Sequence, residues 1–347
     1  MSKPFSFISL LFLGIVLISS CDESAGGSLL PRHSGESGEV LLVMDERRWL
    51  GPEGDSLRTI LEQYVPQLPQ TESMFSLLQF SQAEMSGLLR QHRNIIEIEI
   101  GPDAEGQNKV TLLKDKWSKD QLVFRAYASS AEEWFKLIEK EFPRVVSMIN
   151  DKETSRLQKN YLRNGNKELQ AKAKSKFGIN MLIPLDTEIA VETDNFLWIK
   201  RERVKYLGNS AHDITQGFFI YRYPYHGQVD FDHDVLLVKR DSVLKKYVPG
   251  PERGTYMSTE YRYPPGSRNI TIDEKLAVYT QGLWRTENYF MGGPFRRIAT
   301  TSEAGNEMVV VSGFAFAPKF DKREYVRELD AVIASVKFEK IEQVASN

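Results

Sequence analysis

The stretch Ile96-Glu97-Ile98-Glu99-Ile100 decides the fold class of the first half of the chain. Isoleucine and glutamate alternate strictly in it, and a period of two is typical of a β-strand with one buried face. Working outward, we expect further strands at short, strand-like apolar segments, namely residues 40–44, 74–80, 110–113 and 122–128. These strands together predict an open sheet.

Helices are expected between and after these strands. Residues 55–65 carry apolar side chains at i, i+3, i+4, i+7 and i+8, the spacing of one helix face. Ser81–Glu84 and Ser130–Glu133 both have the serine-to-glutamate spacing of a capping box, which marks the first turn of a helix. The second box opens a long helix whose apolar stripe runs to Ile149. Residues 39–150 are therefore predicted to form a first α+β domain with an open sheet.

A polar stretch over residues 151–178 follows, and it predicts a solvated helical connector that ends at Gly178 as a C-cap. Residues 179–340 then predict a second α+β domain with helices at 235–247 and after Asp321. Its expected strands are residues 179–183, 196–203, 217–223, 256–263, 276–284, 296–301 and 308–316. The whole chain thus predicts an α+β protein with two open, mainly antiparallel sheets, each with helices packed on it.

The N-terminus carries an export and anchoring signal. Lys3 precedes an apolar run, Phe5–Ile18, which is shorter than the roughly 20 residues of a transmembrane helix but fits a signal-peptide core. The four residues that end at Cys21 resemble a bacterial lipobox. A lipobox directs cleavage of the chain before its cysteine, and the cysteine receives lipid such as palmitate. We expect residues 1–20 to be a lipoprotein signal peptide and residues 21–38 a lipidated, flexible tether. The alternative is a plain secretory signal whose cleavage site happens to adjoin a cysteine.

Acylation of Cys21 has consequences for location and chemistry. We expect a lipoprotein of the cell envelope that is held to the outer membrane and faces the periplasm or the cell surface. Cys21 is also the only cysteine, so a lipidated chain has no thiol for a nucleophile, a disulfide or a metal site. The membrane is therefore the first partner that the sequence predicts.

Composition and motifs exclude several other classes. The formal net charge is −2 with acids and bases interspersed, which argues against a nucleic-acid partner. No nucleotide-binding loop, nucleophile elbow or zinc-protease motif occurs, so no catalytic residue and no cofactor is predicted. Asp230, Asp232, His233 and Asp234 form a local cluster, but a calcium loop would need a glycine and a glutamate where Val235 and Asp241 stand. We therefore predict a helix N-terminus or a solvated loop there, and no metal site.

One segment is the best sequence candidate for a ligand surface. It comprises an aromatic and arginine pair and a glycine-rich turn: Trp284, Arg285, Met291, Gly292, Gly293, Pro294 and Phe295. Adjacent glycines permit close backbone approach, and aromatic and arginine side chains dominate binding surfaces. The competing interpretation is a tight structural turn with Phe295 in the core. A repeated Tyr-Arg-Tyr-Pro, at Tyr221–Pro224 and Tyr261–Pro264, predicts two strands that end at proline or a paired ligand platform.

The chain resembles a family of Bacteroidetes-type lipoproteins known as domain of unknown function 4837. Segments from nearly the whole mature chain carry the resemblance: Gly38–Val40, Leu68–Gln70, His92–Ile95, Phe196–Ile199, Arg240–Ser242, Tyr256–Met257, Gly282–Trp284 and Phe290–Phe295. The resemblance implies a membrane-anchored protein exported from a Gram-negative cell. It implies no activity and no catalytic residues.

Two functions remain open from the sequence. The first is a non-enzymatic envelope lipoprotein that binds or assembles an envelope protein or glycan. The second is an envelope glycan hydrolase that uses paired carboxylates, which a fold can bring together from the 47 acidic residues. A cleft with two carboxylates about 5–10 Å apart would favour the hydrolase, and an exposed apolar patch would favour binding.

Overall fold

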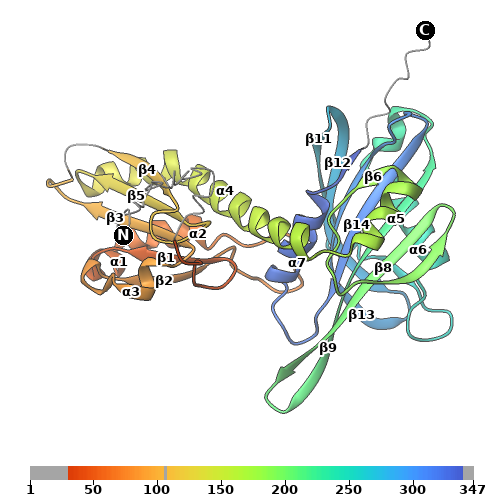
Figure 1. Cartoon of the computed structure of the whole chain (residues 1–347), viewed down its shortest axis with the longest axis horizontal. Coiled ribbons are helices and arrows are strands. Elements are labelled where there is room, and N and C mark those ends of the chain that lie inside the picture. Colours follow the sequence, from red (N-terminus) through yellow and green to blue (C-terminus); the bar gives the residue numbers. More distant parts are fainter. Residues whose placement is uncertain (1–29, 105–107, 339–347) are drawn as a thin grey trace, which may run out of the picture.

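The computed structural model describes residues 30–104 and 108–338. The predicted signal peptide, Cys21 and the first part of the predicted tether lie outside the described residues. Figure 1 shows two lobes, each with its own sheet, joined by the long helix α4 (Ala131–Asn164). The α+β class with open sheets and packed helices is therefore confirmed.

The first lobe contains a five-stranded sheet of order β2-β1-β3-β5-β4. Its elements are β1 (Glu39–Val43), α1 (Glu46–Trp49), α2 (Pro52–Leu61), β2 (Ser76–Phe80), η2 (Gln82–Glu84), α3 (Gly87–Arg90), β3 (Asn94–Ile100), β4 (Lys109–Lys114) and β5 (Leu122–Ala128). The expectation of a mainly antiparallel sheet is wrong here, because β1 pairs in parallel with β2 and β3, and β3 with β5. The physical reason is that helices connect β1 to β2 and β2 to β3, and a crossover returns the chain in the same direction.

Local signals explain most helix boundaries in this lobe. The capping box at Ser81 and Glu84 is present, and the Ser130 side chain accepts a hydrogen bond from the Glu133 amide at the start of α4. Helix α2 begins at Pro52, earlier than predicted, since proline is well suited to a first helical position. The apolar stripe of α4 packs with α2 and the sheet in one core that includes Trp134.

The polar stretch predicted as a solvated connector is helical, but one face of it is buried. Helix α4 continues into it as far as Asn164, and α5 (Lys167–Phe177) follows and ends before Gly178, which has a left-handed φ of 68° as the C-cap signal predicts. Glu153 is fully buried and accepts hydrogen bonds from Arg93 (2.6 Å), Asn94 (2.8 Å) and Arg156 (2.7 Å). This end of α4 is therefore fastened to the first lobe by a buried polar network.

The second lobe contains an eight-stranded antiparallel sheet of order β10-β12-β13-β14-β9-β8-β7, with β11 paired to β12. Its strands are β7 (Glu188–Thr193), β8 (Phe196–Leu207), β9 (Ser210–Pro224), β10 (Met257–Thr259), β11 (Gly266–Ile272), β12 (Lys275–Thr286), β13 (Tyr289–Thr301) and β14 (Glu307–Phe316). Helix α6 (His233–Tyr247), preceded by η3 (Gln228–Phe231), contributes to the core on one face. Helix α7 (Arg323–Ile333) and α5 contribute to the core on the other, beside the short pair β6 (Ile179–Asn180) and β15 (Lys337–Phe338).

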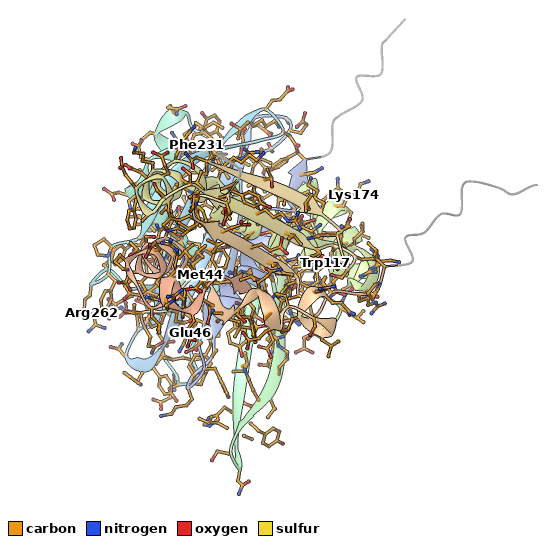
Figure 2. The ribbon with its side chains drawn as sticks, turned by 90° about the vertical axis from the view of Figure 1, so that its left-hand side faces the viewer. Met44, Glu46, Trp117, Lys174, Phe231 and Arg262 are labelled. Atoms are coloured by element: carbon orange, nitrogen blue, oxygen red, sulfur yellow. The ribbon has the colours of Figure 1, made fainter. Side chains whose placement is uncertain are left out.

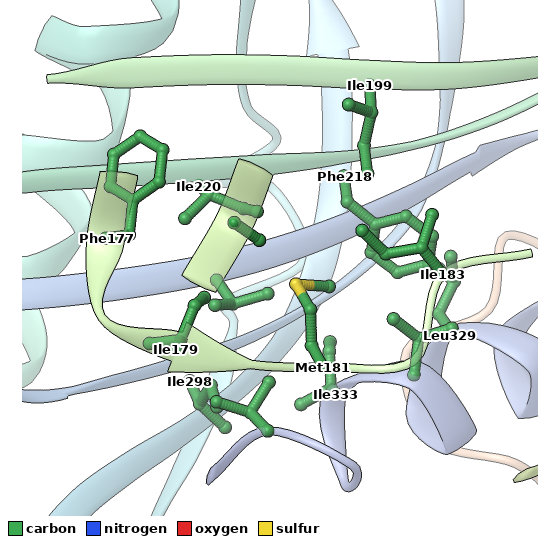
Figure 3. Packing of buried hydrophobic residues seen from close by; sticks show 14 of the residues in the cluster. Phe177, Ile179, Met181, Ile183, Ile199, Phe218, Ile220, Ile298, Leu329 and Ile333 are labelled. Atoms are coloured by element: carbon green, nitrogen blue, oxygen red, sulfur yellow. The ribbon is translucent and has the colours of Figure 1, made fainter. Parts of the chain in front are cut away.

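Figure 3 shows how the second of these cores is filled. Ile199, Phe218, Ile220 and Ile298 come from the sheet, and they meet Leu329 among the residues of α7. Alternate positions of β8, β9 and β13 supply these side chains, which is the strand period that the sequence showed.

Two strands of this eight-stranded sheet were not predicted, β7 and β11. Both lie at the margin of the sheet and expose many of their side chains, so they lack an apolar run. Strands β8 and β9 are also longer than predicted: their paired residues 201–214 form a two-stranded hairpin, with no pairing to β7 or β14. This hairpin projects beyond the rest of the molecule in both views (Figures 1 and 2).

Within the part of the chain that the structure describes, no helix is long and apolar enough to cross a membrane.

Candidate functional site

The structure does not form a surface from the residues predicted as a ligand platform. Trp284 is 2% exposed and Phe295 is fully buried, in the core beneath α6. Gly293 and Pro294 are also buried, and Met291 is half-buried, while Arg285 and Gly292 are exposed. The prediction of a contiguous binding surface is therefore wrong, and the interpretation that places Phe295 in the core is confirmed.

Close backbone packing, rather than ligand binding, accounts for Gly293. A Cβ added there would lie 2.1 Å from the carbonyl oxygen of Ala315, so only glycine fits. The indole N–H of Trp284 donates to this same carbonyl at 3.2 Å. The segment is part of the β12–β13 pairing and not a free turn. The exposed Arg285 side chain forms an ion pair with Glu287 at 2.6 Å.

The acidic cluster at residues 230–234 has a structural role rather than a metal-binding one. Asp230 is buried in η3 and accepts a hydrogen bond from the His226 amide at 2.6 Å, and α6 begins at His233, as predicted for a helix N-terminus. No group of three metal-ligating side chains occurs among the described residues.

Tyr221 and Tyr223 are buried in β9, which ends at Pro224, but Tyr261–Pro264 is an exposed turn after β10. The two copies therefore do not form a paired platform.

A groove of about 830 Å³ lies between the two lobes, and we call it the interdomain groove. One wall is the projecting hairpin, at Arg203, Val204, Lys205 and Ile214. The floor is formed by residues 319–328, which lead into α7 and include its first turns. The opposite wall is the first-lobe loop at residues 71–73. Glu36 of the first lobe also lines it, so both lobes and four separate segments of the chain contribute.

The hairpin wall combines fixed and exposed residues. At its base, Arg201 and Arg203 both pair with Glu328, at 3.3 and 3.2 Å. Further out, the Lys205 ammonium lies 4.7 Å from the centroid of the Phe320 ring. Near the tip, three apolar side chains are more than half exposed, namely Val204 (57%), Tyr206 (68%) and Leu207 (54%). An exposed apolar cluster on a projecting ribbon is typical of an interaction surface.

Both edges of this hairpin are open for backbone pairing in the described part of the chain. Strand β8 pairs with β7 only as far as Lys200, and β9 pairs with β14 only from Thr215 onward. A strand edge whose N–H and C=O groups have no neighbour is a template for an added strand from another chain. The hairpin therefore offers both an apolar tip and a backbone edge beside the groove.

The opposite wall is fixed by a helix cap that crosses the lobes. The Glu72 carboxylate accepts hydrogen bonds from the backbone N–H groups of Lys322 (2.8 Å) and Arg323 (2.7 Å) at the start of α7. Arg323 in turn donates to the carbonyl of Ser73 at 3.0 Å. A carboxylate at a helix N-terminus satisfies free amides and complements the helix dipole. Burial lowers the pKa of the neighbouring Lys322.

Three of the five carboxylates that line the groove are committed to these structural contacts. Glu72 caps α7, Glu324 pairs with Arg323 (2.8 Å) and Arg327 (3.3 Å), and Glu328 pairs with Arg201 and Arg203. Glycoside hydrolysis needs one carboxyl group free to donate a proton and a second free to attack or to activate water. The geometry of these three residues suits a rigid binding groove better than that chemistry.

The sequence contains a signal for the hairpin that the strand prediction missed. Gly208-Asn209 is a two-residue sequence typical of a tight hairpin turn, and Gly208 has a positive φ of 58°. The polar and apolar residues around it alternate only weakly, so the predicted strand ended at Arg203. The groove itself depends on contacts between residues 250 positions apart, which no local pattern reveals.

The comparisons with known proteins identify two families. The model of one, described as a domain of unknown function (DUF4837), matches residues 166–335. The second half of the chain belongs to the DUF4837 family. Residues 33–162 match a different domain of unknown function, DUF8532. The predicted resemblance to DUF4837 is thus confirmed, but its extent is corrected, because Gly38–Val40, Leu68–Gln70 and His92–Ile95 lie in the DUF8532 match.

Similarity to other proteins is distant. No curated protein matches the chain. Among solved structures, a Bacteroides thetaiotaomicron protein is 12% identical with a TM-score of 0.25, over 47% of this chain and 46% of its own, so the chain spans less than half of its length. A protein of unknown function from Pseudomonas aeruginosa, PA94, is 13% identical with a TM-score of 0.19 (34% and 83% covered). The human StarD13 lipid transfer and protein localization domain is 14% identical with a TM-score of 0.20 (50% and 96% covered). At these TM-scores none of the three bears on the function of the DUF4837 domain.

Proposed function

We propose that this protein is a lipid-anchored lipoprotein of the cell envelope that binds an envelope protein and catalyses no reaction. The lipobox at Cys21 supports the anchor. The hairpin beside the interdomain groove supports the binding role, and it is the single observation on which that role rests. Its apolar tip and open strand edges suit a polypeptide partner that adds a strand along residues 201–207 or 210–214.

A protein partner suits this surface better than a glycan. Glycan sites need polar groups that converge on the sugar hydroxyls, whereas the tip presents Val204, Tyr206 and Leu207 to solvent. The hydrolase alternative has less support, since Glu72, Glu324 and Glu328, three of the five groove carboxylates, are held by amides or arginines.

Site-specific crosslinking in intact envelopes tests the binding role. A photoreactive amino acid at Tyr206 should give one discrete protein adduct, and adding Leu207→Ser and Val204→Ser should abolish it. The matched control is the same photoreactive group at Leu88, which is 74% exposed on α3 of the first lobe. Adducts of equal pattern at both positions, or none at Tyr206, would contradict the proposed role of the hairpin.

Two further measurements separate the anchor and the chemistry from the binding role. Fatty-acid labelling should be lost in Cys21→Ser, and equal labelling of the variant would refute lipidation of this residue. Purified protein should leave envelope glycans intact. Glycan turnover that disappears on removal of one carboxylate would replace the binding role with the hydrolase.

A further inference from the structure

A second cavity, of about 330 Å³, lies between the lobes next to the interdomain groove, and we call it the arginine cavity. The first lobe contributes Pro66 and Met74 from a loop, with Asn150 and Thr154 from α4. The second lobe contributes four arginines and one aspartate: Arg268 from β11, Arg296 from β13, and Arg323, Arg327 and Asp330 from α7. Four guanidinium groups and one carboxylate line this small space, and Glu324 pairs with Arg323 and Arg327 from outside it, which leaves a nominal excess of two positive charges.

Arg296 is the most deeply buried of these arginines, at 1% exposed. Its Nη1 and Nη2 donate to the carbonyls of Phe295 (3.1 Å) and Pro66 (3.0 Å), which carry no full negative charge. Its Nε has no hydrogen-bond partner among the described residues, and Asp330 Oδ2 is 3.7 Å from it. A buried cation is costly unless an anion compensates it and its donors are satisfied. The protein therefore compensates the charge of Arg296 only in part, and its Nε, which is itself buried, lacks an acceptor.

Asp330 compensates this charge only in part. Its Oδ1 already accepts a hydrogen bond from the hydroxyl of Tyr279 at 2.7 Å. Because 36% of its side chain is exposed, the carboxyl group lies against open space rather than in a closed ion pair.

Arg268 supplies a second, more accessible guanidinium. Its guanidinium lies 4.2 Å from the centroid of the Tyr279 ring and donates no hydrogen bond to any residue that the structure describes, while its backbone pairs with β12. Stacking on an aromatic face holds the guanidinium plane while leaving its N–H groups free for a ligand. Arg323 and Arg327 instead donate to the carbonyls of Ser73 and Met74, at 3.0 and 3.1 Å, so they add charge and fix the wall.

We propose that the arginine cavity binds a small phosphorylated molecule, with its phosphate group held by Arg268 and Arg296. Guanidinium groups match the geometry of phosphate oxygens, and a doubly charged phosphate compensates the excess positive charge better than a single carboxylate does. A volume near 330 Å³ is at the small end of ligand cavities, which suits a phosphomonoester and excludes a large polymer. Since both lobes wall the cavity, the ligand also stabilises their contact. This site is separate from the hairpin, so the test of phosphate binding is independent of the test of the proposed protein partner.

Calorimetric titration of the full chain in detergent tests the proposal. The probes are inorganic phosphate and glycerol 3-phosphate, with succinate as a dianion of different geometry and chloride at matched ionic strength. The phosphate probes should bind with a dissociation constant below about 1 mM, and their binding should raise the melting temperature. Arg268→Gln should weaken binding by about tenfold or more, because a charged hydrogen-bond donor is lost. Its melting temperature without ligand should hardly change, since the side chain is exposed.

The control is Arg285→Gln, an exposed arginine of the same lobe that does not line the cavity. It should bind the phosphate probes as the wild type does. Absence of binding by the wild type up to about 10 mM would overturn the proposal, as would equal binding by Arg268→Gln. Succinate binding as tight as glycerol 3-phosphate would overturn the phosphate assignment, and an equal effect of chloride would reduce the site to general charge screening.

Discussion

Replacing Glu72 by alanine should loosen the contact between the lobes by about 2–4 kcal/mol. Glu72 is only 8% exposed, and its carboxylate accepts hydrogen bonds from two backbone N–H groups at the start of α7, at 2.8 and 2.7 Å. Hydrogen bonds to a charged group each contribute about 1.5–3 kcal/mol. Water from the adjacent groove would satisfy the freed amides in part, which reduces the sum to the range given.

Hydrogen exchange reports this change where it occurs. Two lobes need not unfold in one step, so a single melting temperature would be a poor measure. A loss of 2–4 kcal/mol should speed exchange of the amides of residues 322–328 by about 30-fold to several hundred-fold, if exchange follows local opening. Amides in the centre of β13 should keep their protection.

Glu84→Ala is the matched control. The Glu84 carboxylate also accepts two hydrogen bonds at a helix start, from the amide (2.7 Å) and hydroxyl (2.6 Å) of Ser81, but it does so within the first lobe. This variant should change exchange only near residues 81–86. The reasoning is refuted if Glu72→Ala speeds exchange at residues 322–328 by less than about threefold, or no more than Glu84→Ala does.

Three further changes test other parts of the structure. Asp241→Ala should lower the free energy of unfolding by about 3–5 kcal/mol, because Asp241 is the carboxylate paired with the fully buried Arg240; a loss below about 1 kcal/mol in urea unfolding would contradict this. Trp284→Ala should cost about 3–5 kcal/mol as a core deletion, whereas Arg285→Ala should stay within about 0.5 kcal/mol, and similar losses for both would argue against the burial difference. Burial, reinforced by nearby arginines, lowers the pKa of His33 to about 4 from its ordinary 6.5, so between these values the unfolded chain binds more protons. Stability is therefore full above pH 6.5 and falls as the pH drops toward 4, by about 1 kcal/mol at pH 5 after allowance for partial exposure, and His33→Gln should flatten that part of the pH profile.

Local patterns were sufficient for much of the fold and insufficient for sheet pairing. The alternation at Ile96–Ile100, the two capping boxes and the Gly178 cap are each decided by neighbours within a few residues, and the structure contains all of them. The direction of pairing in the first sheet depends instead on which strand lies beside β1. That choice is made by helix crossovers that bury one face of the sheet, and a strand pattern alone does not encode it.

The candidate sites were missed for a related reason, which Arg296 and Arg297 illustrate. Adjacent residues of a strand point to opposite faces, and charged residues in a strand normally mark a solvent face. Both side chains are nevertheless buried: Arg297 donates to the carbonyl of Leu236 at 2.7 Å under α6, and Arg296 reaches Pro66 of the other lobe. The two consecutive arginines between Phe295 and Ile298 therefore indicate buried charge, because a sheet that is covered on both faces must bury both side chains. Their specific partners come from elements more than 60 and 200 residues away, so the sequence could indicate that buried charge exists but not that one of the two arginines lines a cavity.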